Sequence, residues 1–138
     1  MKQALHHMTV ETRGQGFIDI TEMLADHIAA EAISRGLLTV WCRHTSASLV
    51  VQENADPDVR ADLEAFFRRL VPEAGRYRHA AEGPDDMPAH IRAALTLTQV
   101  SVPLEDGRLA LGRWQAIYLF EHRATPRRRE LVLHLIGE

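Results

Sequence analysis

The sequence contains a single cysteine, little net charge and no long apolar run. Because Cys42 has no partner within the chain, an internal disulfide is excluded and a reducing compartment is favoured. A net charge of −3 gives no overall field that would attract nucleic acid or an acidic membrane. No stretch approaches the roughly 18 apolar residues of a membrane span, and the N-terminus lacks the apolar core of a secretion signal. We therefore expect a cytoplasmic protein that binds neither nucleic acid nor membrane.

The composition is that of a globular protein. With 46% hydrophobic and 25% charged residues, residues 1–138 are expected to form a single domain with its own core. No repeat, linker or low-complexity run divides the chain. Cys42 lies in an apolar run, which predicts a buried, inert thiol and not a nucleophile. Eight histidines stand out, because imidazole carries protons near neutral pH and binds metals.

Three helices are predicted from apolar spacing and capping residues. The first covers about residues 22–35 and follows Thr21, which suits an N-cap. The second follows Asp56 as N-cap, has Pro57 in its first turn, and carries a clear apolar stripe. The third is short, at about residues 87–95.

Strands are predicted at residues 4–12, 37–44, 46–51, 96–104, 108–123 and 130–137. The sequence EDGR between two of them indicates a hairpin, because an Asp-Gly pair suits a tight turn. The order of strands and helices is not a regular βαβ repeat. We therefore predict an α+β fold, a single domain in which a large mixed or mostly antiparallel β-sheet has helices packed on one face.

Polar residues gather where the predicted strands and helices end, which is where sites are usually built. HTSAS (44–48) has two interpretations. In one it orients a phosphate or serves as an acid–base pair, and in the other its hydroxyls only satisfy backbone groups at a strand end. In QENADPD (52–58), capping explains Asp56. GRWQ (112–115) and EHR (121–123) lie on one predicted strand, and an arginine beside a histidine suits an anion.

The segment EGPDDMPAHI, which begins at Glu82, holds more acid than a helix cap needs. Capping accounts for one of Asp85 and Asp86 and leaves the other carboxylates unexplained. Hard cations such as Mg²⁺ take carboxylate oxygens, whereas imidazole suits Zn²⁺. His79 and His90 flank this acidic turn and are expected to converge on it. No histidine pair has the helical spacing of the zinc proteases, so the fold must assemble any metal site.

Other charged groups are expected to be structural or solvated. His6, His7, His27 and His134 belong to this set. The run Arg127–Arg129 is predicted to be a solvated turn before the last strand, with a phosphate-facing patch as the alternative.

The series HTSAS, EN-x-DP, Y-x-H, EG-x-DDMP-x-HI, GR, G-x-WQ and EHR resembles the YjbQ-like family, some of whose members are known as secondary thiamine-phosphate synthases. The resemblance runs from about residue 5 to the terminal GE. It implies an α+β fold with a large mixed sheet and a homotrimer with sites near subunit interfaces. The chain departs from the family pattern at Arg113, where the usual residue is threonine, and at Gln52, where many members have asparagine.

The resemblance implies a transferase that joins a hydroxymethylpyrimidine diphosphate to a thiazole phosphate and releases diphosphate. The expected catalytic residues are His44, Ser46, Glu82, Asp85 and Asp86; the expected substrate or phosphate contacts are Thr45, Asn54, Trp114, Gln115 and Arg123; and the expected metal ligands are His79, His90 and His122. A divalent ion, Mg²⁺ or Zn²⁺, would help to neutralise the departing diphosphate. The alternative is a homotrimeric module that binds a metal or a small molecule, because no nucleophile is recognisable.

Overall fold

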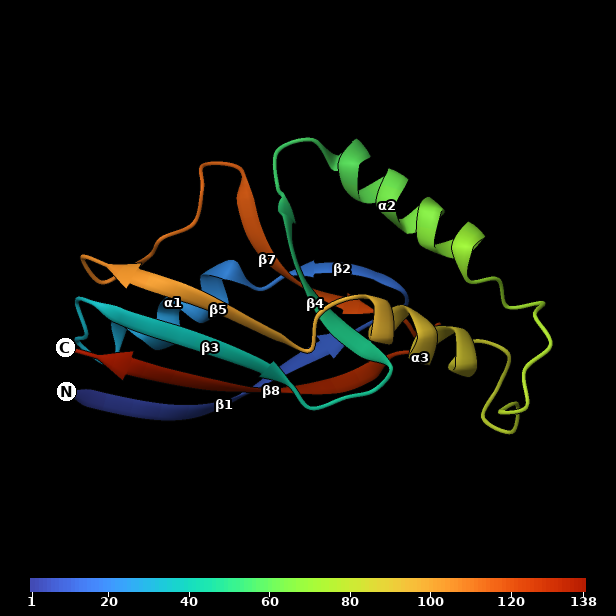
Figure 1. The fold of residues 1–138 in the computed structure, drawn as a ribbon, viewed down its shortest axis with the longest axis horizontal. Helices are drawn as coiled ribbons and strands as arrows, with labels where there is room; N and C mark the ends of the chain where they lie inside the picture. Colours follow the sequence, from blue (N-terminus) through green and yellow to red (C-terminus); the bar gives the residue numbers. More distant parts are fainter.

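The computed structural model describes all 138 residues and has an α+β architecture with three helices (Figure 1). The elements in chain order are β1 (Lys2–Thr12), β2 (Gly16–Asp19), α1 (Thr21–Ala29), β3 (Gly36–Cys42), β4 (Ala47–Glu53), α2 (Pro57–Leu70), α3 (Asp86–Leu95), β5 (Gln99–Glu105), β6 (Arg108–Leu109), β7 (Gln115–Glu121) and β8 (Arg127–Gly137). No helix is long and apolar enough to cross a membrane. The predicted α+β single domain is confirmed.

The strands form two sheets. The larger sheet has the order β1-β8-β3-β5-β6 and the smaller one the order β2-β7-β4. Every strand pairing is antiparallel, so the expected mostly antiparallel sheet is observed and the mixed alternative is not. The hydrophobic core contains residues from both sheets together with α1, which supplies Leu24 and Ile28. The single large sheet that the sequence suggested is therefore divided into two layers around one core.

Strand β7 is buried on both faces. Ile117 and Leu119 belong to the core between the sheets. The alternate residues face α2: the ring of Phe120 lies 5.5 Å from that of Phe67, and Tyr118 accepts a hydrogen bond from Arg60 over 3.0 Å. Because both faces are covered, β7 is a near-continuous apolar run and lacks the alternation of β5 and β8.

Two local predictions are confirmed in detail. The carboxylate of Asp56 accepts a hydrogen bond from the backbone N–H of Asp58 over 2.9 Å, so it caps α2 as expected. The EDGR turn joins β5 to β6, and Asp106 and Gly107 have φ values of 50° and 74°. Both central residues of the turn are thus left-handed, as a two-residue hairpin of this kind requires.

Three local predictions are wrong. Helix α1 ends at Ala29 and not at residue 35, because the chain turns through Ala32, with φ 49°, to enter β3. Thr21 is not its N-cap, since its hydroxyl accepts a hydrogen bond from the N–H of Ile117. The strand expected at 108–123 is interrupted by a loop between β6 and β7.

The arginine run at 127–129 is not a solvated turn. It begins β8, and the side chain of Arg129 is buried. Its guanidinium donates from Nε to Oε1 of Glu121 over 2.8 Å and also contacts the other oxygen through Nη2. Nη2 further donates to the carbonyl and the hydroxyl of Ser46, so the pair also fixes the HTSAS segment.

Candidate functional site

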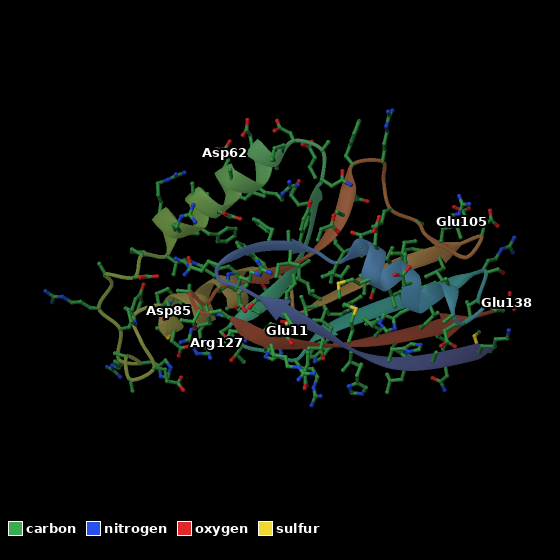
Figure 2. The ribbon with its side chains drawn as sticks, turned by 180° about the vertical axis from the view of Figure 1, so that it is seen from behind. Glu11, Asp62, Asp85, Glu105, Arg127 and Glu138 are labelled. Carbon is green, nitrogen blue, oxygen red and sulfur yellow. The ribbon has the colours of Figure 1, made fainter.

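Four side chains of the types that serve as metal ligands form a cluster at the N-terminal end of α3. His79, Glu82, Asp86 and His90 each offer one ligand atom, and these atoms all lie within 4.8 Å of one another. Oδ2 of Asp86 lies 2.6 Å from Nε2 of His79 and 3.2 Å from Nε2 of His90. Nε2 of His79 is also 3.3 Å from Oε2 of Glu82. Figure 2 shows the neighbouring Asp85 at the end of the molecule opposite Glu138.

The ring of His90 is oriented by the HTSAS segment. Its Nδ1 lies 2.9 Å from the carbonyl oxygen of Thr45, which can only accept, so Nδ1 carries a hydrogen. The lone pair of the neutral ring is then on Nε2, which faces Oδ2 of Asp86. Two acceptors meet there, and either a proton on Nε2 or a cation between them must stabilise the contact. Metal-binding histidines are commonly fixed in this way by a hydrogen bond from the second nitrogen.

Arg123 holds the two aspartates in place. Its Nε donates to Oδ2 of Asp85 over 2.9 Å, its Nη1 to Oδ1 of Asp86 over 2.8 Å, and its Nη2 to the carbonyl of Glu82 over 2.9 Å. The backbone N–H of Ala124 also donates to Asp85 over 2.8 Å. Each of its three nitrogens donates to one of these acceptors, so Arg123 orients the two carboxylates, and its expected contact with a phosphate stays a prediction.

The two aspartates remain ionised at neutral pH despite partial burial. Burial raises the pKa of Asp86, but hydrogen bonds from its neighbours and the charges of His90 and Arg123 outweigh this effect, so the net pKa is lowered. For Asp85, burial is likewise outweighed by the Ala124 N–H and by Arg123, which lowers its pKa. The cluster therefore presents negative charge toward His79 and His90, which favours a bound cation.

An open pocket of about 570 Å³ adjoins the cluster and shares His90 with it. Small side chains form part of its wall, including Cys42, Ala93 and Ala94, and Trp41 also lines it. His44 and Thr45 of HTSAS line the pocket too, so three of the expected site residues meet here. A mostly apolar hollow with a few polar groups is typical of a small-molecule site.

His44 and Ser46 are less free than a catalytic pair would be. Nε2 of His44 accepts the backbone N–H of Glu130 over 2.7 Å. Burial, followed by the charge of Arg129, lowers the pKa of His44, so its ring is neutral near pH 7. The hydroxyl of Ser46 is held by Arg129 over 3.0 Å. His44 lines the pocket with a nitrogen already engaged, and Ser46 is not among the lining residues.

His122 does not join the metal cluster. It is fully buried under α3, where its Nε2 lies 2.8 Å from the hydroxyl of Ser48. Burial, with the nearby charge of Arg92, lowers its pKa to about 3, so the ring is neutral. Of the three histidines expected to bind a metal, His79 and His90 are brought together and His122 is not.

The remaining expected contacts lie at the far end of the β4–β7 ribbon. Asn54 and Trp114 are joined there by a backbone hydrogen bond, and Oε1 of Gln115 accepts the N–H of Gly112 over 2.7 Å. Because β4 spans seven residues, this end lies about 20 Å from the end that carries Ala47 and α3. Arg113 stacks on the exposed ring of Trp114 at 4.7 Å. Within one chain, these residues do not reach the metal cluster.

Some features of the site were not predicted. Trp41 was not singled out, and the carboxylate of Asp86 was not identified as the contact that His79 and His90 share. The spacing of Asp86 and His90 held the missing signal, because residues four apart lie on one face of a helix. The residues around Trp41 in the sequence do not identify it as part of a pocket, because the pocket forms only when α3 packs beside β3 and β4.

Comparisons with known proteins agree with the resemblance found in the sequence motifs and with the fold. A family model described as "UPF0047 protein YjbQ-like" matches residues 6–138. The chain is 50% identical over 132 residues to a UPF0047 protein of Synechocystis sp., covering 95% of this chain and 90% of that protein. It is 41% identical over 132 residues to the UPF0047 protein YjbQ of Escherichia coli, covering 95% and 96%.

A solved structure of a YjbQ/UPF0047-family protein from Clostridium acetobutylicum is similar in fold. It superposes with a TM-score of 0.88 at 35% sequence identity, covering 95% of this chain and 99% of that one. A YbjQ-like protein of Sulfolobus solfataricus shares the fold at 18% identity with a TM-score of 0.87. The match over almost the whole chain, together with these identities, shows that the chain belongs to the YjbQ-like UPF0047 family.

Proposed function

We propose that this chain is a metal-dependent transferase of the thiamine-phosphate synthase type. It would join a hydroxymethylpyrimidine diphosphate to a thiazole phosphate, and the pocket of Trp41, Thr45 and His90 would hold the substrates. The observation that carries the proposal is the contact of His90 Nε2 with the carboxylate of Asp86 beside an open pocket, which a cation between the two atoms would stabilise. An arrangement of this kind favours a cation next to a space of ligand size.

The donor set favours Zn²⁺ over Mg²⁺. His79 and His90 offer imidazole nitrogens, and Glu82 and Asp86 offer carboxylate oxygens. Two nitrogens and two oxygens suit a four-coordinate zinc ion, whereas Mg²⁺ takes oxygen ligands and retains several waters. The Thr45 carbonyl and Arg123 would act as the outer partners that orient His90 and Asp86.

The chemistry needs stabilisation of a leaving group. The nitrogen of the thiazole phosphate forms a bond to the exocyclic methylene of the pyrimidine, while the carbon–oxygen bond to diphosphate breaks and diphosphate leaves with the electron pair. When bound, the ion would supply positive charge for the departing diphosphate. Trp41 offers an aromatic face to the pyrimidine ring, and Arg43, which also lines the pocket, offers a charge-assisted contact to phosphate.

The proposal is tested by metal content and product formation together. Purified protein is loaded with Zn²⁺, desalted and assayed by elemental analysis, then mixed with both substrates and assayed for thiamine phosphate by mass spectrometry. The variants His79→Ala and His90→Ala are expected to lose the metal and to form product at least about 100-fold more slowly. His134→Ala, which changes a histidine outside the cluster, is the matched control. Unchanged metal content in both cluster variants would refute the site.

A second candidate function is a metal- or small-molecule-binding module without turnover. It is favoured by the hydrogen bonds that already engage Ser46 and His44, which leave no evident nucleophile. It predicts that the cluster variants lose metal, while the wild-type protein forms no product above a metal-free control. Formation of thiamine phosphate by the wild-type protein therefore distinguishes the two candidate functions in the same experiment.

The same proposal includes assembly into a homotrimer. Leu37 and Ile136 are paired across β3 and β8, and both are exposed on the outer face of the larger sheet together with Leu5 and Trp41. Such a face is suited to burial against a second copy of the chain. Light scattering after gel filtration is expected to give three times the chain mass for the wild type and a lower mass for Leu37→Asp. A monomeric wild type would contradict it.

A further inference from the structure

Arg92 is a buried cation without a counter-ion. Its side chain is 4% exposed, and it takes part in no ion pair within 4.0 Å. Its Nη2 donates to the carbonyl of Val71 over 2.8 Å, while its Nε is buried and has no hydrogen-bond partner. Glu73 and Asp85 act on it only from beyond ion-pair distance. A buried charge left in this state is costly and requires compensation.

A second buried polar atom without a hydrogen-bond partner belongs to His122. Nδ1 of His122 is buried and unpartnered, and both His122 and Arg92 face a small cavity of about 10 Å³. That volume is close to what one water-sized occupant needs. Arg68 also lines the cavity and adds positive charge. Two acids also line the cavity: Glu121 pairs with Arg129, and Glu64 lies 4.0 Å from Arg68 and offsets its charge.

A hydrogen-bond chain on the other side of His122 determines which ring nitrogen carries the hydrogen, and therefore whether Nδ1 is a donor or an acceptor. Thr96 Oγ1 donates to the hydroxyl of Ser48, which in turn lies 2.8 Å from Nε2 of His122. With Thr96 as donor, the Ser48 hydrogen goes to Nε2, and the neutral ring carries its own hydrogen on Nδ1. Two residues of the cavity wall then each carry a donor without a partner, Arg92 Nε–H and His122 Nδ1–H. If Thr96 instead donates to the carbonyl of Arg92, 2.9 Å away, the chain reverses and Nδ1 becomes an acceptor.

We propose that this cavity binds one small monovalent anion of halide size, held between Arg92 Nε and His122 Nδ1. An anion satisfies two donors and neutralises the guanidinium, whereas a water molecule would leave the charge uncompensated. The cavity is too small for phosphate or sulfate. The site lies beneath α3, is separate from the metal cluster, and would stabilise the packing of α3 on β4 and β7.

Crystals soaked in bromide provide the direct test, because bromide scatters anomalously. The expected result is a single strong peak within hydrogen-bonding distance of Arg92 Nε and His122 Nδ1 in the wild type. The peak is expected to be absent in Arg92→Gln and present in Glu64→Gln, the matched control on the same cavity wall. Density for a water molecule alone in the wild type would overturn the proposal.

Thermal unfolding tests whether the anion binds in solution. The midpoint is measured in sodium chloride and in sodium gluconate at equal concentration, since gluconate is too large for the cavity. Chloride is expected to raise the wild-type Tm by about 3 °C or more. Glu64→Gln is expected to keep this difference and Arg92→Gln to lose it. Equal midpoints for the wild type in the two salts would refute a solution site.

The tautomer of His122 gives a readout that does not depend on a variant folding. Long-range ¹H–¹⁵N spectra report which ring nitrogen carries the hydrogen. With chloride added to protein in gluconate, the hydrogen is expected on Nδ1, because the anion accepts from that atom. A hydrogen that stays on Nε2 at saturating chloride would mean that water bridges Arg92 and His122, and the anion site would be rejected.

Discussion

Nη1 of Arg123 donates to Oδ1 of Asp86 over 2.8 Å, while the other oxygen of that carboxylate faces His79 and His90. One guanidinium thus fixes which oxygen is available to a cation. Because Arg123 is only 11% exposed and also binds Asp85, its geometry leaves little freedom.

Replacing Arg123 by lysine should weaken metal binding without removing a ligand. Lysine keeps the charge but cannot reach Asp85, Asp86 and the Glu82 carbonyl at once, so the carboxylate of Asp86 loses its orientation. We expect the Zn²⁺ dissociation constant of Arg123→Lys to rise about 10–100-fold in competition titrations with a chelating dye. Arg113→Lys, at the far end of the β4–β7 ribbon, is the control and should bind as the wild type does.

The stability of the protein should fall between pH 8 and pH 5 because of His122. Its folded pKa is about 3, below the ordinary value of 6.5, so the unfolded chain takes up a proton in this window and the folded chain does not. The sign is therefore a loss of stability as pH falls, of about 2 kcal/mol at pH 5.

The control for this pH dependence is His122→Gln measured by urea unfolding in halide-free buffer. The variant is expected to be less stable at pH 8, since it loses the packing and hydrogen bonding of the buried ring. Its pH dependence should be flatter than that of the wild type by about 2 kcal/mol. His134→Gln, on the outer face of β8, should retain the wild-type slope. Equal slopes for the wild type and His122→Gln would contradict the assignment.

The buried pair of Glu121 and Arg129 should be costly to break. Glu121→Gln leaves the guanidinium without its charge partner in a dry environment, and we expect a loss of about 3–5 kcal/mol of unfolding free energy. The double variant Glu121→Met with Arg129→Met should be less destabilised than Glu121→Gln, because no unpaired charge remains. Glu11→Gln, which breaks an exposed contact with Arg128, should change stability by less than about 1 kcal/mol.

The N-cap of α2 is a simpler test of local structure. Asp56→Ala removes the acceptor for the N–H of Asp58 and should cost about 1 kcal/mol in urea unfolding. Asp62→Ala changes an exposed aspartate on the same helix and should have a much smaller effect. A loss as large for Asp62→Ala as for Asp56→Ala would show that general charge on α2, and not the cap, sets the value.

The sequence predicted elements whose causes are local. Asp56 and the Asp-Gly turn were assigned correctly because capping and turn chemistry depend on a few neighbouring residues. The end of α1 was not predicted correctly, because the helix must stop where the chain enters β3, and the position of β3 is set by its pairing in the sheet. The burial of Arg129 was missed for the same reason, since its partner Glu121 lies eight residues away on another strand.

The site was predicted in part. His79, Glu82, Asp86 and His90 lie within twelve residues, so their convergence depends mostly on one turn and one helix. Trp114 and Gln115 were grouped with them by motif, but the direction of β7 carries them to the far end of the β4–β7 ribbon. His122 and Arg123 are adjacent in sequence and follow the end of β7, yet His122 is buried beside Ser48 while Arg123 contacts Asp85 and Asp86.

Because β7 is covered on both faces, its register against β2 and β4 needs a determinant other than hydrophobic burial. From Ala116 to Phe120 the strand is apolar on both sides, so burial of hydrophobic area alone would tolerate a shift by one residue against β2 or β4. The consecutive polar pair at its end removes this tolerance, since a shift would turn Glu121 away from Arg129 and bring the neutral ring of His122 against that guanidinium. Two buried polar residues thus help to fix the register of β7, which burial of its apolar residues alone does not determine.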